Sequence, residues 1–100
     1  MLLENGSHLV YAFAEENGEV YARALFCAGP SILEDPATGS AAGALGAYLW
    51  KYRGRQSFFV HQGEEMGRGA MIHVEVSPDG KVVKVGGSAI VVARGDIEVP

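Results

Sequence analysis

The segment with the clearest potential for chemistry comprises residues 34–40, with the sequence Glu-Asp-Pro-Ala-Thr-Gly-Ser. It directly precedes residues 41–50, an uncharged run of small and apolar residues that we interpret as a helix. Because free backbone N–H groups at the start of a helix bind anions, this junction could hold a carboxylate. The candidate ligands are the residues at the junction, Thr38, Gly39 and Ser40. Asp35 would lie at the edge of the site, where its carboxyl group could move a proton to or from a bound acid.

A purely structural interpretation of the same residues competes with this one. Aspartate followed by proline is also typical of an ordinary helix cap, with Asp35 as the cap and Pro36 in the first helical position. The segment lacks the Gly-Lys-Ser/Thr element of a phosphate-binding loop, and its glycines lie at the start of the predicted helix or inside it. Nucleotide-binding motifs are therefore excluded, while a carboxylate site and a plain cap both stay open.

Composition excludes several other classes of function. The chain has 100 residues and a net charge of −4, which fits one domain spanning residues 1–100 and argues against a nucleic-acid partner. The basic cluster Lys51, Arg53 and Arg55 follows the predicted helix and suits the negative end of its dipole; a small anion site is the alternative. A single cysteine, Cys27, permits neither an internal disulfide nor a cysteine-based zinc site. No metal site is predicted, because ligand spacing is absent among the histidines, which are His8, His61 and His73.

Nothing in the sequence predicts insertion into a membrane. The longest uncharged apolar stretch is too short and too rich in glycine to span a bilayer. Residues 1–6 have neither the basic start nor the long apolar core of a signal peptide. We therefore expect a cytoplasmic protein with no membrane partner.

Alternating apolar residues and turn signals predict strands on both sides of the helix in the sequence. Residues 9–13 and 20–26 flank Asn17-Gly18, a strong hairpin signal. Residues 28–31 interrupt this pattern, and residues 32–33 form only a brief apolar pair. Further strands are predicted at residues 58–61, 71–76, 82–85, 88–93 and 97–99.

The predicted helix over residues 41–50 carries no charge on any side. A helix that is apolar all round must be buried all round, and its small residues would let strands approach closely. We therefore predict an α+β fold in which a curled, mostly antiparallel sheet, a half-barrel, wraps round one central helix.

Three segments resemble one known family. Residues 34–45, Glu-Asp-Pro-Ala-Thr-Gly-Ser-Ala-Ala-Gly-Ala-Leu, closely resemble the hallmark of the phenazine-biosynthesis PhzF-like family. Residues 62–68 and 85–89 also look like that family, in the right order, so the resemblance covers nearly the whole chain. It implies the diaminopimelate-epimerase fold, with two similar halves and an active site in the cleft between them. Family members are about twice this long, and this sequence matches only the C-terminal half.

The resemblance also implies roles for individual residues. Asp35 matches the family's acidic active-site residue, and residues 38–40 match the stretch that holds the substrate's acid group. A second family motif, expected near the cleft, contributes three further candidate substrate-binding residues, Gln62, Gly63 and Arg68. For Arg68, an ion pair within the loop is an equally good interpretation. The family's proton-shuttling glutamate belongs to the other half, and Glu34 is not its equivalent.

The cysteine and the histidines are weaker candidates. Thiol-dependent epimerases of this fold carry a cysteine at the start of the central helix, whereas Cys27 lies well upstream and resembles a small core residue. His61 ends a predicted strand, where a cleft position is possible. A structural role is the better prediction for both His61 and His73.

The resemblance predicts a cofactor-independent isomerase or epimerase that acts on a small carboxylic acid by proton transfer. A lone half would expose the apolar surface that normally meets its sister half, which predicts a homodimer or, failing that, a separately encoded partner supplying the N-terminal half. The alternative function is a catalytically incomplete half that binds small acids or serves as a subunit.

Overall fold

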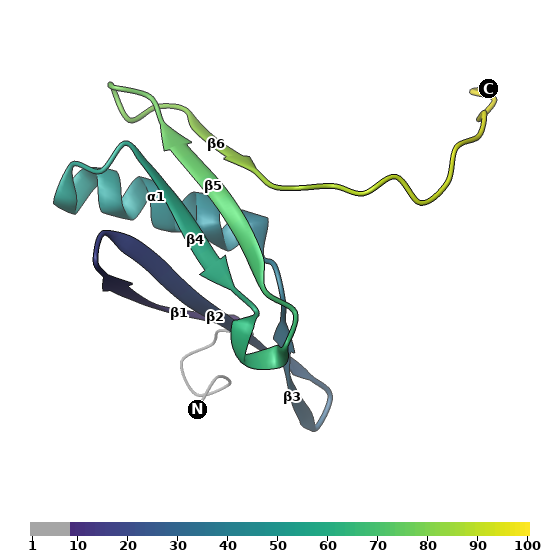
Figure 1. Cartoon of the computed structure of the whole chain (residues 1–100), viewed down its shortest axis with the longest axis horizontal. Helices are drawn as coiled ribbons and strands as arrows, with labels where there is room; N and C mark the ends of the chain where they lie inside the picture. Colours follow the sequence, from purple (N-terminus) through teal and green to yellow (C-terminus); the bar gives the residue numbers. More distant parts are fainter. Residues whose placement is uncertain (1–8) are drawn as a thin grey trace.

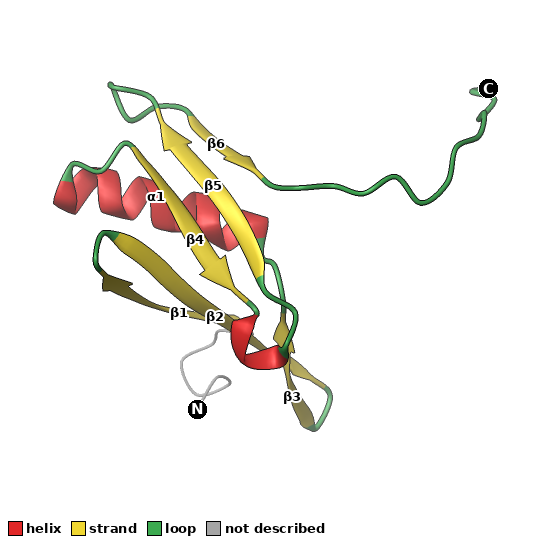
Figure 2. Cartoon of the chain, viewed as in Figure 1, coloured by secondary structure: helices red, strands yellow, loops and turns green. Residues whose placement is uncertain are grey.

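The computed structural model describes residues 9–100, which form one curled sheet with a single α-helix against one face (Figures 1 and 2). The elements in chain order are β1 (Leu9–Glu16), β2 (Glu19–Ala28), β3 (Ser31–Asp35), α1 (Gly39–Arg53), β4 (Ser57–Gln62), the short 3₁₀ helix η1 (Glu64–Met66), β5 (Ala70–Val76) and β6 (Val83–Gly86). The strand order is β1-β2-β4-β5-β6, with β3 also paired to β2. Strands β2 and β4 run parallel and the other pairs are antiparallel, which confirms the predicted α+β fold with a mostly antiparallel sheet.

Two tight hairpins shape the first half of the sheet. Asn17 and Gly18 connect β1 to β2 with φ angles of 52° and 79°, as a type I′ turn requires. This confirms the predicted hairpin. Strand β2 then continues to Ala28 and returns as β3 through Gly29, which has a φ of 60°. The prediction that residues 28–33 only interrupt the pattern was therefore wrong, because a glycine-led two-residue turn lets the chain reverse there.

The core lies between α1 and the sheet. The helix contributes the buried residues Ala42, Leu45, Gly46 and Leu49. The sheet contributes alternate residues of its central strands, among them Val20, Ala22, Phe58, Val60, Ile72 and Val74. Period-2 alternation in the strands puts all of these side chains on the face that α1 covers.

The helix is covered on one face only, so the prediction that it is buried all round was wrong. Ala44 and Ala47 are exposed, and Tyr48 retains 49% of its accessible surface. The reason is that the sheet is open: among the described residues, β1 and β6 are edge strands that do not pair with each other. The ring of Tyr48 meets Phe13 edge-on, with ring centroids 6.1 Å apart.

The end of α1 is tied to the first hairpin. Gly54 closes the helix in the left-handed conformation, and its N–H donates to Trp50 O. Arg53 and Arg55 then form ion pairs with Glu15 at 2.7 and 3.3 Å. The basic cluster is therefore a helix end, as predicted, rather than an anion site.

The chain after β6 forms no strand, contrary to the strands predicted at residues 88–93 and 97–99. Figure 1 shows this segment running away from the sheet. The register explains the difference. His73 pairs with Gly86, so continuing the ladder brings Ala89 opposite Ala70, where β5 begins. Beyond Ala89 the segment has no residue of β5 to pair with, and an extended segment without a partner is not a strand.

Candidate active site

The junction between β3 and α1 carries the residues singled out in the sequence. Strand β3 ends at Asp35 and α1 begins at Gly39, close to the predicted helix start. The cap residue is Thr38, with extended backbone angles of φ −113° and ψ 90°. Asp35 therefore lies three residues before the cap, and the interpretation of Asp35 as a plain helix cap was wrong.

Thr38 uses its hydroxyl group to hold Asp35 rather than to cap the helix. Thr38 Oγ1 donates to Asp35 Oδ2 at 2.5 Å, and its side chain makes no cap hydrogen bond. Gln62 Nε2 donates to Thr38 Oγ1 at 2.8 Å. Because the amide N–H already donates into this oxygen, the hydroxyl proton is directed to the carboxylate. One carboxylate oxygen, Oδ2, is fixed in this way, and Oδ1 accepts no hydrogen bond within the described part of the chain.

Gln62 is the centre of the network. Its side chain is fully buried, at 0% exposure, and its Nε2 also donates to the backbone oxygen of Asp35 at 2.9 Å. Its Oε1 accepts from the backbone N–H of Thr38 at 3.1 Å and from the hydroxyl of Tyr11 at 3.3 Å. The Thr38 N–H can only donate and the Asp35 carbonyl can only accept, which determines the orientation of the amide. Gln62 thus joins β1, β4 and the Asp35–Thr38 segment.

Tyr11 supplies the β1 side of this network. Burial raises the pKa of the Tyr11 phenol to about 12, because its charged form would lose hydration in the fold. The phenol therefore stays protonated at neutral pH and can donate to Gln62.

Gly63 brings a second loop against the first. It has a φ of 82°, and a Cβ on it would lie 2.5 Å from the backbone oxygen of Arg68 and 2.7 Å from that of Pro36. Both distances are far below contact, so only glycine fits. The backbone of residues 62–68 is thereby packed against the residue that follows Asp35.

The start of α1 is open. Gly39 and Ser40 are exposed, and among residues 9–100 the backbone N–H groups of Gly39, Ser40 and Ala41 have no hydrogen-bond acceptor. The first internal bond of the helix start is the one from Ala42 N to Thr38 O, at 3.1 Å. Three N–H groups and the positive end of the helix dipole are therefore available to an anion.

The structure brings most of the predicted site residues together and leaves Arg68 apart from them. It joins Asp35, Thr38, Gln62 and Gly63 directly, and Gly39 and Ser40 follow in the chain. Gln62 and Gly63 position this segment, and direct contact with a substrate stays a prediction for them. Arg68 is exposed, and its side chain forms no ion pair with any described residue, so the loop ion pair is not observed.

The neighbouring acid, Glu34, has a structural partner. Arg23 binds both of its carboxylate oxygens, at 3.1 and 2.7 Å, across the β2–β3 pair. This hydrogen-bonded pairing lowers the pKa of Glu34. Glu34 is therefore tied down on the strand, in line with the expectation that it is not the family's glutamate.

The histidines lie on the sheet face opposite α1. His61 alternates with buried residues of β4 and stacks on Tyr21, with ring centroids 4.8 Å apart. His73 stacks on Phe59 at 4.6 Å and shares a hydrogen bond with Ser57 at 3.0 Å. These contacts support the structural role predicted for both. Cys27 is partly buried on β2 and is a free thiol.

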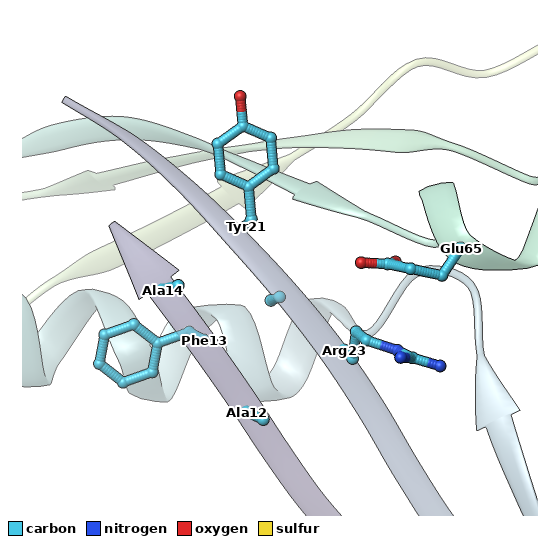
Figure 3. Close-up of a pocket in the computed structure, with 7 residues that line it drawn as sticks. Ala12, Phe13, Ala14, Tyr21, Arg23 and Glu65 are labelled. Carbon is cyan, nitrogen blue, oxygen red and sulfur yellow. The ribbon is translucent and has the colours of Figure 1, made fainter. Parts of the chain in front are cut away.

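Two shallow hollows lie on the described part of the chain near these elements. The one in Figure 3, about 250 Å³, is lined by residues of β1 and β2 and by Glu65, and none of its lining residues is a predicted site residue. A second, about 320 Å³, borders the junction itself. Its lining residues are Ala37, Gly69, the first three residues of β5 (Ala70, Met71 and Ile72), Gly87 and Ser88. The sequence motif at residues 85–89 could have indicated this contribution.

No group of three His, Cys, Asp or Glu residues in the described part of the chain could hold a metal ion. Among those residues, no helix is long and apolar enough to cross a membrane. His8 and residues 1–6, which entered the predictions above, lie outside the described residues.

Comparison with known proteins identifies the family. The sequence model of the PhzC-PhzF family, described as phenazine biosynthesis-like protein, matches residues 2–95. The chain belongs to this family. An uncharacterized isomerase of Clostridium acetobutylicum is 32% identical over 96% of this chain and 35% of its own length. An uncharacterized isomerase of Deinococcus radiodurans is 40% identical over 92% of this chain and 33% of its own length.

The PhzF-like resemblance noted in the sequence is thus confirmed. The chain spans about a third of the length of the curated relatives that it matches, not the half that the resemblance implied. The remaining two thirds of a phenazine biosynthesis-like protein have no counterpart in these 100 residues.

Proposed function

We propose that this chain acts in a cofactor-independent isomerisation or epimerisation of a small carboxylic acid by proton transfer. The observation that carries the proposal is the Asp35 carboxylate, held on one oxygen by Thr38 and directly preceding the open start of α1. The family and the isomerase names of its relatives support the same class of reaction.

The binding step uses the helix start. The substrate carboxylate accepts hydrogen bonds from the N–H groups of Gly39, Ser40 and Ala41, and the hydroxyl of Ser40 is a further donor. The rest of a small acid lies in the hollow beside Ala37. The positive end of the helix dipole favours the charged form of the ligand.

The chemical step uses the free oxygen of Asp35. Oδ1 takes the proton from the carbon next to the acid group, and the electron pair of the broken C–H bond passes into the carboxylate to form an enediolate. The N–H groups that bind the acid stabilise this added negative charge. A second acid then returns a proton to the opposite face of the same carbon, which inverts or isomerises it.

The second acid comes from outside this copy of the chain. We propose a homodimer in which the second Asp35 faces the same cleft, so that one carboxylate serves as the base and the other carboxyl group, protonated, serves as the acid. A separately encoded partner that supplies the missing portion of the family is the other source.

Asp35 is tested by deuterium exchange. The purified chain is incubated in D₂O with a panel of small carboxylic acids, and incorporation at the carbon next to the acid group is followed by NMR. Asp35→Asn should lower the exchange rate by about 100-fold or more, the usual contribution of general base catalysis. Asp79→Asn, the same change in an exposed turn, is the matched control. Equal exchange rates for wild type and Asp35→Asn would refute the role of Asp35.

A second candidate function follows from the length of the chain. Because it spans only a third of its relatives, it could bind a small acid and lack turnover. Titration calorimetry with the same acids distinguishes the two functions. Binding without deuterium exchange supports the binding module, and exchange supports the enzyme.

A further inference from the structure

Residues 83–99 have a regular pattern that the single chain uses only in β6, residues 83–86. Every odd-numbered residue is apolar or glycine, namely Val83, Val85, Gly87, Ala89, Val91, Ala93, Gly95, Ile97 and Val99. The even-numbered positions carry all the charges of the segment, which are Lys84, Arg94, Asp96 and Glu98. Period-2 alternation of this kind, interrupted only around Ile90 and Val92, is typical of a strand with one face against a core.

Most of this apolar surface is exposed. Val91, Ile97 and Val99 retain 68%, 90% and 87% of their accessible surface, and on the other face Ile90 and Val92 retain 87% and 92%. The register of β5 with β6 leaves no partner residue of β5 beyond Ala89. Figure 1 shows the chain after β6 extended and running away from the sheet.

We propose that residues 83–99 of two copies pair with each other as antiparallel strands, about a two-fold axis at Val91. The segment is close to a palindrome in chemical character. With Val91 opposite its own copy, the pairs are Ile90 with Val92, Ala89 with Ala93, Ser88 with Arg94, Gly87 with Gly95, Gly86 with Asp96, Val85 with Ile97, Lys84 with Glu98 and Val83 with Val99. Apolar residues meet apolar residues, and the lysine meets a glutamate twice by symmetry.

The occupant of this edge is a second copy because, in the two-fold register, Lys84 of each copy meets Glu98 of the other and the apolar positions meet one another. A shift of the pairing by one residue would place Lys84 opposite Ile97 or Val99. The charged side chains of one strand would then share a face with the apolar side chains of the other. An isologous pairing of this kind also closes on itself and forms a dimer rather than a fibre.

The two-stranded ribbon formed by residues 83–99 of the two copies fits the packing of β6 on the helix. Val85 faces α1, since a Cβ added at Gly43 would lie 3.4 Å from its Cγ2. Ile97 of the second copy, opposite Val85, lies on this same face of the ribbon. It thereby extends the apolar cover of α1 toward the side that the open sheet leaves exposed, where Ala44 and Ala47 lie.

The ribbon also reaches the proposed site, and in this respect it rests on the proposed function. Ser88 lines the hollow beside Ala37. Arg94 of the second copy lies opposite Ser88, so pairing brings a cation to the edge of the hollow proposed to hold an acid. Because the two copies of Ser88 lie six residues apart along the ribbon, about 20 Å, this dimer keeps two separate hollows. The second acid of the proposed reaction then comes from the separately encoded partner and not from the second Asp35.

Cysteine cross-linking tests the two-fold axis. In a Cys27→Ala background, Val91→Cys places two thiols opposite each other, at a Cα separation of about 4.5–5.5 Å that permits a disulfide. Ile97→Cys is the matched control, because two copies of residue 97 are twelve residues apart along the ribbon, about 40 Å. After mild oxidation, Val91→Cys should run as a covalent dimer on a non-reducing gel and Ile97→Cys as a monomer. Equal cross-linking of both, or of neither, would overturn the ribbon.

Charge reversal provides a second test that needs no new thiol. Lys84→Glu should raise the dimer dissociation constant about tenfold, measured by sedimentation, because it creates two like-charge pairs. Lys84→Glu combined with Glu98→Lys should restore it. A dimer insensitive to these changes and not cross-linked at residue 91 overturns the ribbon and leaves the proposed homodimer standing, whereas a monomeric wild type overturns both. A cross-linked dimer without deuterium exchange retains the ribbon and refutes turnover by the homodimer alone.

Discussion

At the scale of single residues, Gln62 and Gly63 decide where Asp35 lies. The Gln62 amide uses both of its donor hydrogens and its oxygen within the chain, and Gly63 lets two backbones meet. Both residues can position Asp35 only because β4 closely approaches the Asp35–Thr38 segment. The loop after β4 is therefore part of the site through positioning.

Replacement of Gly63 tests this close approach. Gly63→Ala should lower the free energy of unfolding by about 3–5 kcal/mol, because it combines a left-handed backbone with a Cβ inside contact distance of two carbonyl oxygens. Gly67→Ala is the matched control, with a φ of 71° and nothing within 4 Å of its Cβ, and should cost only about 1–2 kcal/mol. Urea unfolding of the two variants measures the difference, and equal losses would contradict the close packing.

Tyr11 provides a test by pH. Its pKa is raised to about 12 in the fold, so between pH 10 and 12 the unfolded chain loses the phenol proton while the folded chain keeps it. Stability conferred by the neutral phenol is therefore present below pH 10 and is lost as the pH rises toward 12. Tyr11→Phe should show a smaller loss of unfolding free energy than wild type over that window. Parallel curves for the two proteins would show that the phenol is not buried as described.

At the scale of elements, α1 packs most closely on the sheet at one glycine. A Cβ at Gly46 would lie 2.6 Å from Cγ1 of Val74, a fully buried and stiff side chain, whereas a Cβ at Gly43 would lie 3.4 Å from its nearest neighbour. The uncharged, small-residue character of the helix serves this contact with β5 and does not reflect burial on every side.

The two glycines make a matched pair of variants. Gly46→Ala should destabilise the protein by about 1–2 kcal/mol, because overpacking against Val74 exceeds the gain of about 1 kcal/mol in helix propensity. Gly43→Ala should be neutral or stabilise by up to about 1 kcal/mol. Thermal unfolding of both variants measures the two signs. Stabilisation by both substitutions would show that the helix lies farther from β5.

At the scale of the whole molecule, the proposed homodimer would cover the apolar side chains that residues 90–99 leave exposed. A homodimer gains stability from association, so the thermal midpoint of wild type should rise by a few degrees as protein concentration is raised. Lys84→Glu should weaken this dependence, because it weakens the proposed ribbon. Scanning calorimetry over a hundredfold concentration range measures it, and a midpoint independent of concentration would argue for a monomer.

The sequence by itself determined the elements whose cause is local. The Asn17-Gly18 turn, the helix start near Gly39 and the alternating strands β4 and β5 were predictable, because turn chemistry and periodicity act over a few residues. The family and Asp35 as a candidate followed from one long motif.

Tertiary structure decided everything that depends on a partner far along the chain. Only the approach of β4 to the Asp35–Thr38 segment shows that Asp35 is no cap, and that Gln62, 27 residues away from it, holds it in place. The exposed side of α1 and the absence of a strand after β6 follow from which strands lie next to one another. A sequence pattern states that a segment can be buried or paired, and the presence of a neighbour decides whether it is.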